Sequence, residues 1–298
     1  MSSSKLVRHP LPHPTESLPG YVLRLSEING YTAPRSLFRL ADFKANETSV
    51  SNFNCSKLAS ISDVPISVLE KIAITCPESD PHSLRLLGNR LSSDDLNLTR
   101  ARVCPECVTE RGFIEAHWHI ELMVACPVHE RSAVWFCGKC QSQLSWLRSG
   151  LLRCKCGDSL AHSSRASYSE EELCLLDLIR QKALNEPLPS RRDPRMPVNQ
   201  LETLNLQELL SIVRFLGNQR IRASGINKPQ FSAQILRAAT KVLLDWPANF
   251  GTLLRDIYPH APARQPTAHM QDLANVYQVI SERYGSRLSE QKLYRVGV

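Results

Sequence analysis

The residues of this chain best suited to chemistry are cysteines and a histidine that recur at short spacings. Seven of the ten cysteines, together with His129, lie between positions 104 and 156. They form four close pairs: Cys104 and Cys107, Cys126 and His129, Cys137 and Cys140, Cys154 and Cys156. Two ligands in one tight turn can reach the same ion, and two such turns complete the tetrahedron that zinc prefers. The pattern therefore predicts two zinc ions.

Pairing the turns in chain order predicts the ligands of each ion. The first set is Cys104, Cys107, Cys126 and His129, and the second set is Cys137, Cys140, Cys154 and Cys156. Each set has four protein ligands, which leaves no coordination position for water, so both ions are expected to be structural. A cross-braced arrangement, in which the first and third pairs share an ion, uses the same ligands and stays open from spacing alone.

Other roles for these and nearby residues are less well supported. A catalytic zinc needs an open position and a carboxylate base, and Glu106 or Glu130 could serve only if one ligand is misassigned. His117 and His119 would point to opposite faces of a strand, so we expect them at the surface or beside the ligands. Three further cysteines lie in apolar helical contexts and are predicted to be buried thiols: Cys55, Cys76 and Cys174.

The elements that must position these ligands are predicted to be mainly α-helical, with small zinc-ribbon β hairpins, because apolar residues recur at helical spacing on both sides of the block. One hairpin is expected over 143–153, with its turn at Ser149-Gly150. Four regions follow: an extended N-terminal arm over 1–15, a helical domain over 16–100 with a helix-turn-helix-like unit, a double zinc-binding module over 101–160, and a C-terminal helical domain over 165–298.

Capping residues predict where several helices begin and end. Ser17 is expected to cap a first helix. Residues 57–61 and 65–74 are predicted to form two helices around a turn, which resembles a DNA-reading helix-turn-helix in outline or is an ordinary helical hairpin. Capping boxes are expected at Ser169 and at Asn205 with Glu208. Gly217 is expected to end the helix that Asn205 begins.

The composition supports a folded chain with a mildly basic balance. It has 298 residues, 42% of them hydrophobic, and 36 Lys and Arg against 29 Asp and Glu, a net charge of +7. These values exclude a wholly disordered or fibrous protein. No apolar stretch long enough for a transmembrane helix and no secretory signal is found. We therefore expect a cytoplasmic protein with reduced thiols and no membrane partner.

Positive charge is concentrated in one segment. Residues 180–241 contain eleven Lys and Arg but four Asp and Glu. The resulting net charge of +7 equals the net charge of the whole chain. Such a segment attracts phosphates, although many basic helix faces bind nothing. The candidate nucleic-acid contacts are Arg191, Arg192, Arg195, Arg214, Arg220, Arg222, Lys228 and Arg237. No phosphate-binding loop, dinucleotide fingerprint, nucleophile elbow or zinc-protease helix is present. A paired-carboxylate nuclease site stays open from the sequence, although the Asp and Glu residues cluster in the first turns of helices, where the helix dipole explains them.

Taken together, these motifs resemble the TniQ/TnsD family of transposon target-selection proteins. The resemblance rests on the opening from Pro12 to Leu25, which contains Glu-Ser-Leu and then Arg-Leu, and on the Cys/His block with Trp118. A later match is the run Leu-Leu-Asp-Trp-Pro-Ala-Asn-Phe over 243–250. The first two features are specific only in combination.

The resemblance implies an adaptor without catalytic activity. Family members link a target-recognition complex, in some systems an RNA-guided CRISPR effector with its guide RNA, to an AAA+ ATPase that recruits the transposase. Direct DNA contact and a homodimer are left open. Two alternatives come from other classes: a sequence-specific transcription regulator built from a helix-turn-helix and a zinc ribbon, and a zinc-dependent hydrolase.

Overall fold

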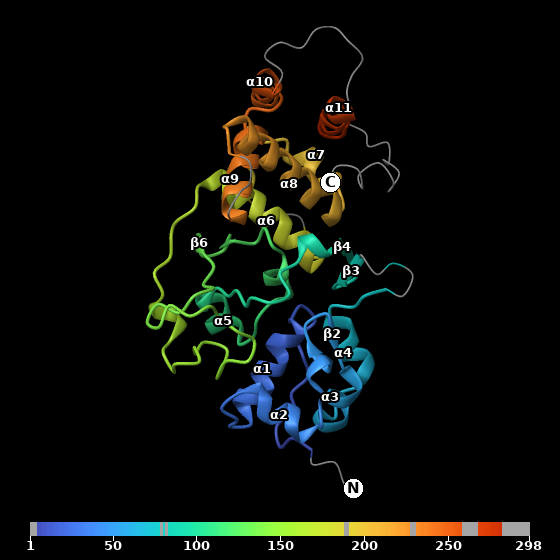
Figure 1. The fold of residues 1–298 in the computed structure, drawn as a ribbon, viewed down its shortest axis with the longest axis vertical. Coiled ribbons are helices and arrows are strands. Elements are labelled where there is room, and N and C mark those ends of the chain that lie inside the picture. Colours follow the sequence, from blue (N-terminus) through green and yellow to red (C-terminus); the bar gives the residue numbers. More distant parts are fainter. Residues whose placement is uncertain are drawn as a thin grey trace. The chain divides into compact units, whose positions relative to one another are not determined.

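The computed structural model describes residues 5–77, 80, 83–187, 191–226, 231–257 and 268–281, and the following account concerns these residues. They are mostly helical, with three two-stranded antiparallel hairpins, which confirms the predicted fold class. The chain divides into two compact units (Figure 1). The N-terminal unit comprises residues 1–167 and 183–185, and the C-terminal unit comprises 168–182 and 186–298.

The N-terminal unit begins with four helices around one apolar core. They are α1 (Leu18–Ile28), α2 (Pro34–Leu40), α3 (Cys55–Ser62) and α4 (Ile66–Ile72). The hydroxyl of Ser17 accepts a hydrogen bond from the Gly20 amide at 3.1 Å, which confirms the predicted cap of α1. Leu25 of α1 and Leu58 of α3 are completely buried in the same cluster, so helices distant in sequence share this core.

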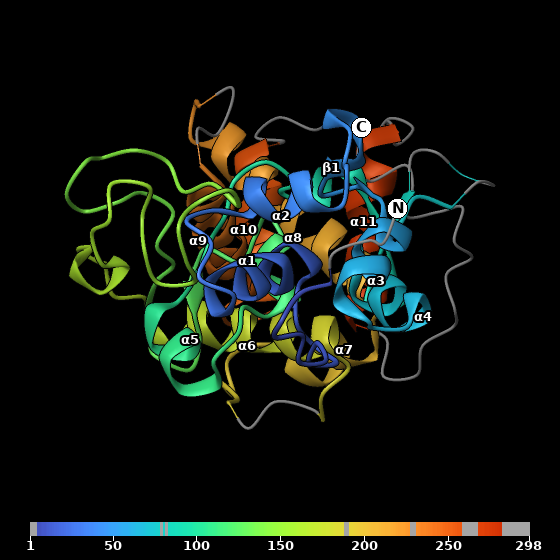
Figure 2. The ribbon, with the colours of Figure 1, turned by 90° about the horizontal axis from the view of Figure 1, so that it is seen from below.

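Helices α3 and α4 lie side by side, as Figures 1 and 2 show. Asp63 ends α3 in the left-handed region at φ 56°, and Pro65 precedes the first turn of α4. A buried Ile61 and a buried Leu69 hold the pair against the core. The two predicted helices and their turn are therefore present, while DNA reading by this pair stays a prediction.

The described part of the N-terminal arm, residues 5–15, has no helix and is fixed to the helices beside it. The amide of Leu6 donates to the carbonyl of Ile61 at 2.8 Å, and the Leu6 side chain is buried in the core. The Asn29 side chain bonds both the amide and the carbonyl of Arg8. The arm is thus extended but anchored.

The rest of the N-terminal unit consists of short elements and loops. Its hairpins are β1 (Thr48–Ser49) with β2 (Asn52–Phe53), β3 (Ser83–Leu86) with β4 (Asn89–Ser92), and β5 (Ala125–Cys126) with β6 (Arg131–Ser132). One α-helix, α5 (Pro105–Arg111), and four 3₁₀ turns complete it: η1 (Ala45–Glu47), η2 (Ser93–Asp95), η3 (Ala116–His119) and η4 (Leu160–His162).

The hairpin predicted over 143–153 is wrong. Gln143 bridges backward to Phe136, and Arg153 bridges forward to Ser159, so the two halves do not pair with each other. The guanidinium of Arg148 occupies the space between them and donates to the carbonyls of Ser145 and Leu151. A buried cation therefore satisfies backbone groups that a hairpin ladder would have paired.

The C-terminal unit is built from helices. They are α6 (Glu170–Leu184, whose last two residues belong to the N-terminal unit), α7 (Val198–Thr203), α8 (Leu206–Ala223), α9 (Ser232–Leu243), α10 (Ala248–Ile257) and α11 (Ala268–Ser281). Both predicted capping boxes are confirmed: Ser169 with Glu172 on α6, and Asn205 with Glu208 on α8. No helix among the described residues is long and apolar enough to cross a membrane.

Gly217 does not end its helix, contrary to the sequence prediction. Helix α8 continues through it to Ala223. A Cβ atom at Gly217 would lie 2.4 Å from the carbonyl oxygen of Ile235 on α9. The missing side chain of Gly217 therefore allows the backbones of α8 and α9 to approach closely. The helix continues through this residue although glycine has a low helix propensity.

Substituting Gly217 with alanine is expected to destabilise the C-terminal unit by about 2 kcal/mol, because the clash is with backbone that must shift. Gly251→Ala is the matched control, since the nearest atom to a Cβ there is the Arg255 side chain at 3.8 Å. Chemical denaturation of both variants measures the difference. Equal stability of the two would contradict the proposed backbone contact.

Candidate metal centres

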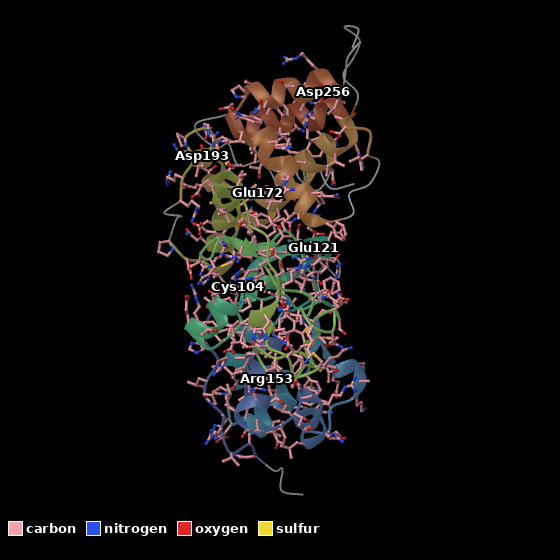
Figure 3. All side chains as sticks on the ribbon, turned by 90° about the vertical axis from the view of Figure 1, so that its left-hand side faces the viewer. Cys104, Glu121, Arg153, Glu172, Asp193 and Asp256 are labelled. Atoms are coloured by element: carbon pink, nitrogen blue, oxygen red, sulfur yellow. The ribbon has the colours of Figure 1, made fainter. Side chains whose placement is uncertain are left out.

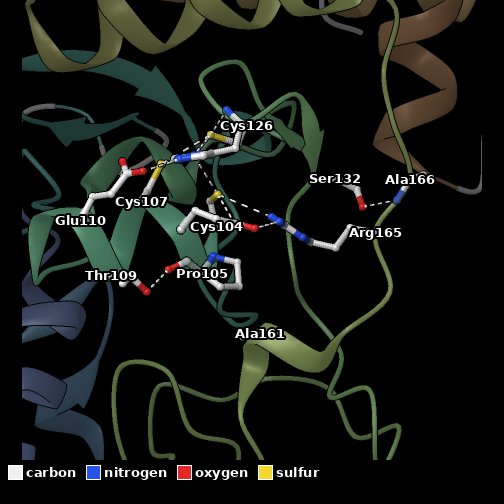
Figure 4. A network of polar contacts seen from close by, with 12 residues as sticks. Cys104, Pro105, Cys107, Thr109, Glu110, Cys126, Ser132, Ala161, Arg165 and Ala166 are labelled. Atoms are coloured by element: carbon white, nitrogen blue, oxygen red, sulfur yellow. Dashed lines mark hydrogen bonds and ion pairs between the residues drawn. The ribbon is translucent and has the colours of Figure 1, made fainter.

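The first Cys/His cluster forms where α5 meets the β5–β6 hairpin (Figure 4). Cys104 precedes the first turn of α5 and Cys107 lies within that turn, so both thiols face the same point. Cys126 is on β5, and His129 lies in the turn that follows. The Nδ1 atom of His129 is 3.4, 3.3 and 3.5 Å from the sulfurs of Cys104, Cys107 and Cys126.

The second cluster is assembled from two turns without regular secondary structure. The sulfurs of Cys137 and Cys156 are 3.7 Å apart, and those of Cys140 and Cys154 are also 3.7 Å apart. The backbone of Gly157, which follows the last turn, has φ 86°, and its amide donates to the Cys154 carbonyl. The donor atoms within each cluster all lie within 4.8 Å of one another.

These distances fit tetrahedral coordination. Zinc–sulfur bonds of about 2.3 Å place the sulfurs of a tetrahedral site about 3.8 Å apart, and a nitrogen ligand shortens the edge slightly. The spacings of both clusters lie close to this value. The ligand groups follow chain order, Cys104 to His129 and then Cys137 to Cys156, which is not the cross-braced arrangement. The two clusters could therefore hold two zinc ions.

Neighbouring groups favour the thiolate form of two ligands. Hydrogen bonds from the Cys104 and Cys107 thiols lower the pKa of Cys126 to about 3. In the second cluster, hydrogen bonds from Ser142 lower the pKa of Cys140 to about 6. Since the thiolate is the metal ligand, one sulfur of each cluster is already prepared for binding near neutral pH.

A carboxylate lies beside the histidine of the first cluster. The Nε2 atom of His129 lies 2.9 Å from the Oε1 atom of Glu110, one helical turn beyond Cys107 on α5 (Figure 4). With a metal ion bound at Nδ1, which faces the three sulfurs, Nε2 would carry the proton and donate a hydrogen bond to this carboxylate. Such a partner holds the ring orientation and makes the imidazole a stronger ligand. Glu110 was not among the predicted site residues, although its position three residues after Cys107 places the two side chains on the same face of a helix.

Replacing Glu110 by glutamine is expected to weaken metal binding at the first cluster by about 10-fold, because the charged partner of His129 is lost. Competition between the protein and a zinc-binding dye measures the affinity. Glu70→Gln, at an exposed position on α4, is the control. Wild-type affinity in the Glu110 variant would show that the carboxylate does not support the ligand.

The two histidines beside Trp118 are buried, so a position at the surface, one of the two predicted alternatives, is wrong. His117 and His119 are each 1% exposed and belong to η3, not to a strand. The Nδ1 atom of His119 donates to the Asn97 carbonyl, 3.3 Å away, and burial lowers the pKa of His119 to about 4. It is therefore a neutral core residue at physiological pH.

The remaining cysteines divide by environment. Cys55 and Cys174 are buried, as predicted, and burial raises the pKa of Cys55 to about 11. Cys76 is exposed, which contradicts the prediction of a core thiol, because α4 ends at Ile72 and the chain becomes exposed after Ile74. Neither buried thiol outside the clusters is therefore suited to act as a nucleophile.

Most of the candidate nucleic-acid contacts form ion pairs within the C-terminal unit. Five are paired with carboxylates: Arg191 with Glu170, Arg192 with Glu202, Arg195 with Glu171 and Asp193, Arg220 with Asp256, and Arg237 with Glu172. Figure 3 labels three of these partners. Arg222 is exposed on α8, Arg214 is partly buried, and Lys228 lies outside the described residues. The net charge of the segment is thus offset by acidic residues outside it.

Comparison with known families identifies the N-terminal unit. The sequence model of the TniQ family matches residues 7–132. These residues therefore form a TniQ domain. The TniQ match contains the whole first cluster and ends before the second. No curated protein matches the chain.

The opening motif of the TniQ domain has a structural explanation. Glu16 is completely buried and accepts two hydrogen bonds from Arg24, at 2.8 and 2.6 Å. Arg24 also donates to the Leu11 carbonyl in the arm, and the Glu16 carboxylate accepts from the His13 amide. Ser17 caps α1 between them. The motif thus fastens the arm to the first helix of the domain.

Proposed function

We propose that this chain is a target-selection adaptor of a transposition system. The observation that carries the proposal is the TniQ domain, which indicates a transposition-associated target-selection family of non-catalytic adaptors. In this role the chain links a target-DNA recognition complex to an AAA+ ATPase regulator of transposition. An RNA-guided CRISPR effector with its guide RNA is one form that the recognition complex could take, and the complex would assemble in the cytoplasm.

We further propose that both clusters bind zinc and that both ions are structural. The donor sets support this, because three thiolates with one imidazole and four thiolates are the ligands of structural zinc sites. Residues Cys104, Cys107, Cys126 and His129 would hold the first ion, and Cys137, Cys140, Cys154 and Cys156 the second. Bound zinc would contribute folding energy to a region with few regular elements.

A closed coordination shell supports a role without catalysis. Four protein ligands leave no position at which zinc could activate water or polarise a substrate. The Glu106 carboxylate, a candidate base, pairs instead with the guanidinium of Arg165. The centres therefore suit a rigid scaffold, and the helices over 16–100 and 165–298 would supply separate surfaces for different partners.

Direct nucleic-acid contact by the basic residues of 180–241 is retained as a secondary proposal. Arg222 is its strongest member, because its side chain is exposed at the end of α8. The paired arginines would first have to exchange a carboxylate for a phosphate. The substitution Arg222→Ala would remove one phosphate contact. The slope of the logarithm of the DNA-binding constant against the logarithm of the salt concentration would then decrease in magnitude by about one.

Co-purification tests the adaptor proposal. The full chain, an AAA+ regulator from a TniQ-containing transposon, ATP and target DNA are expected to form a complex in which the chain undergoes no turnover. Arg24→Met, which breaks the buried ion pair of the TniQ domain, is expected to abolish the complex, and Arg35→Met at an exposed position is the control.

Two results would overturn the proposal. Cleavage, joining or hydrolysis of nucleic acid by the purified chain, lost on mutation of a carboxylate, would indicate an enzyme. Binding of one DNA sequence without partners, about 10³-fold more tightly than random DNA, would indicate the transcription regulator.

A further inference from the structure

The segment after the second cluster connects the two metal centres. Residues 157–167, called here the returning segment, leave the turn of Cys154 and Cys156 and run back to the first cluster. Figure 4 shows Arg165 of this segment beside Cys104, and Ala166 beside Ser132. It lies outside the TniQ match, which ends at residue 132. The first centre is therefore completed by a part of the chain beyond the TniQ domain.

At its start, the returning segment is attached to both turns of the second centre. The Cys154 amide donates to the Asp158 carbonyl at 2.9 Å. The Gly138 amide, between the ligands Cys137 and Cys140, donates to the Ser163 hydroxyl at 3.1 Å. A Cβ atom at Gly138 would lie 3.1 Å from the His162 carbonyl oxygen, so the segment passes directly over this turn. Its path depends on the folded form of the second centre.

At its end, the returning segment is attached to the first centre. The Ser132 amide donates to the Ala166 carbonyl at 2.8 Å, and the Ala166 amide donates to the Ser132 hydroxyl at 3.0 Å. Between these attachments and the second centre, Arg165 points at the ligands. Its Nη1 atom donates to the Cys104 sulfur at 3.6 Å, and its Nη2 atom pairs with Glu106.

Charge explains what Arg165 contributes. Three thiolates, one neutral imidazole and a divalent ion carry a net charge of −1, which is costly in a largely buried cluster. The Arg165 side chain is 8% exposed, so its positive charge acts at short range with little screening by solvent. A donor to a ligating sulfur also fixes the orientation of that ligand. The Nη1 atom of Arg165 thus brings a positive charge directly to the Cys104 sulfur.

We propose that Arg165 is a positioning residue of the first metal centre and that the second centre holds it in place through the returning segment. Metal at the second centre therefore strengthens metal binding at the first. Loss of the second ion would free the returning segment and withdraw Arg165 from Cys104, and by linkage the two ions would strengthen each other's binding by the same factor. This inference rests on metal binding by both clusters and is independent of the adaptor role.

The first experiment measures zinc release from the full-length, zinc-loaded chain into an excess of a chelating dye. Arg165→Gln is expected to release one ion about 10-fold faster than the wild type, while the other ion leaves at the wild-type rate. Arg165→Lys, which keeps the charge but loses the planar fork, is expected to fall between them. Arg85→Gln, at an exposed position on β3, is the control and is expected to be unchanged.

The second experiment removes a ligand of the second centre. Cys140→Ser is expected to retain one ion, to release that ion about 10-fold faster than the wild type does, and to increase amide hydrogen exchange over 160–167. Hydrogen exchange over 104–111 reports that the first centre is folded before chelation. Release of both ions at wild-type rates from Arg165→Gln, or an unchanged rate for the first-centre ion in Cys140→Ser, would overturn the proposal.

Discussion

Substitution of Cys107 by serine is expected to release one zinc ion per chain and to unfold the region around the first centre. Cys107 is 3% exposed and lies close to both Cys126 and His129. Structural zinc binding contributes about 10–16 kcal/mol in small zinc domains, whereas whole domains are stable by only about 5–15 kcal/mol. Losing a ligand therefore removes a large part of the stability of this region.

Zinc content by mass spectrometry and unfolding by circular dichroism measure this prediction. Cys55→Ser is the matched control, because Cys55 is also a buried thiol of the N-terminal unit but lies outside both clusters. It is expected to lose about 1 kcal/mol of stability and no zinc. A Cys107 variant that keeps two ions and unfolds like the control would contradict the ligand assignment.

Replacing Arg24 by methionine is expected to destabilise the N-terminal unit by about 3–5 kcal/mol, because it leaves the Glu16 carboxylate buried without its partner. The side chains of Arg24 and Glu16 are 11% and 0% exposed, so water cannot take the place of the guanidinium. The arm should also detach, since Arg24 donates to the Leu11 carbonyl.

Urea denaturation of a double-mutant cycle measures the pair. Glu16→Gln removes the buried charge, so the double variant Glu16→Gln with Arg24→Met is expected to be more stable than Arg24→Met alone. Arg35→Met, at an exposed position on α2, is expected to change stability by less than about 0.5 kcal/mol. Additive effects of the two core substitutions would show that Glu16 and Arg24 are not coupled.

Local signals in the sequence predicted much of the fold. Ser17, Ser169 and Asn205 each cap the helix expected to follow them, since a cap involves residues within three positions of one another. The Cys/His spacing likewise predicted the four close pairs, because each pair occupies one turn, whereas the structure decided which pairs share a cluster. Short-range geometry is encoded by neighbouring residues, and these elements depend on little else.

The errors arise where distant residues decide the outcome. Gly217 looked like a helix stop, but the approach of Ile235 from α9 explains it. The charge count over residues 180–241 indicated an excess of positive charge. It did not include the partners of several of these arginines, because Glu170, Glu171, Glu172 and Asp256 lie outside 180–241. Arg165 was missed for the same reason, since no spacing links it to Cys104.

Native mass spectrometry of the full-length chain tests the central claim most directly. The account predicts that the compact, low-charge species carries two zinc ions, and that acid or a strong chelator converts it to a metal-free, extended species. A metal-free species with the same compact charge distribution would contradict the claim that Cys104, Cys107, Cys126, His129, Cys137, Cys140, Cys154 and Cys156 hold the N-terminal unit together through bound metal.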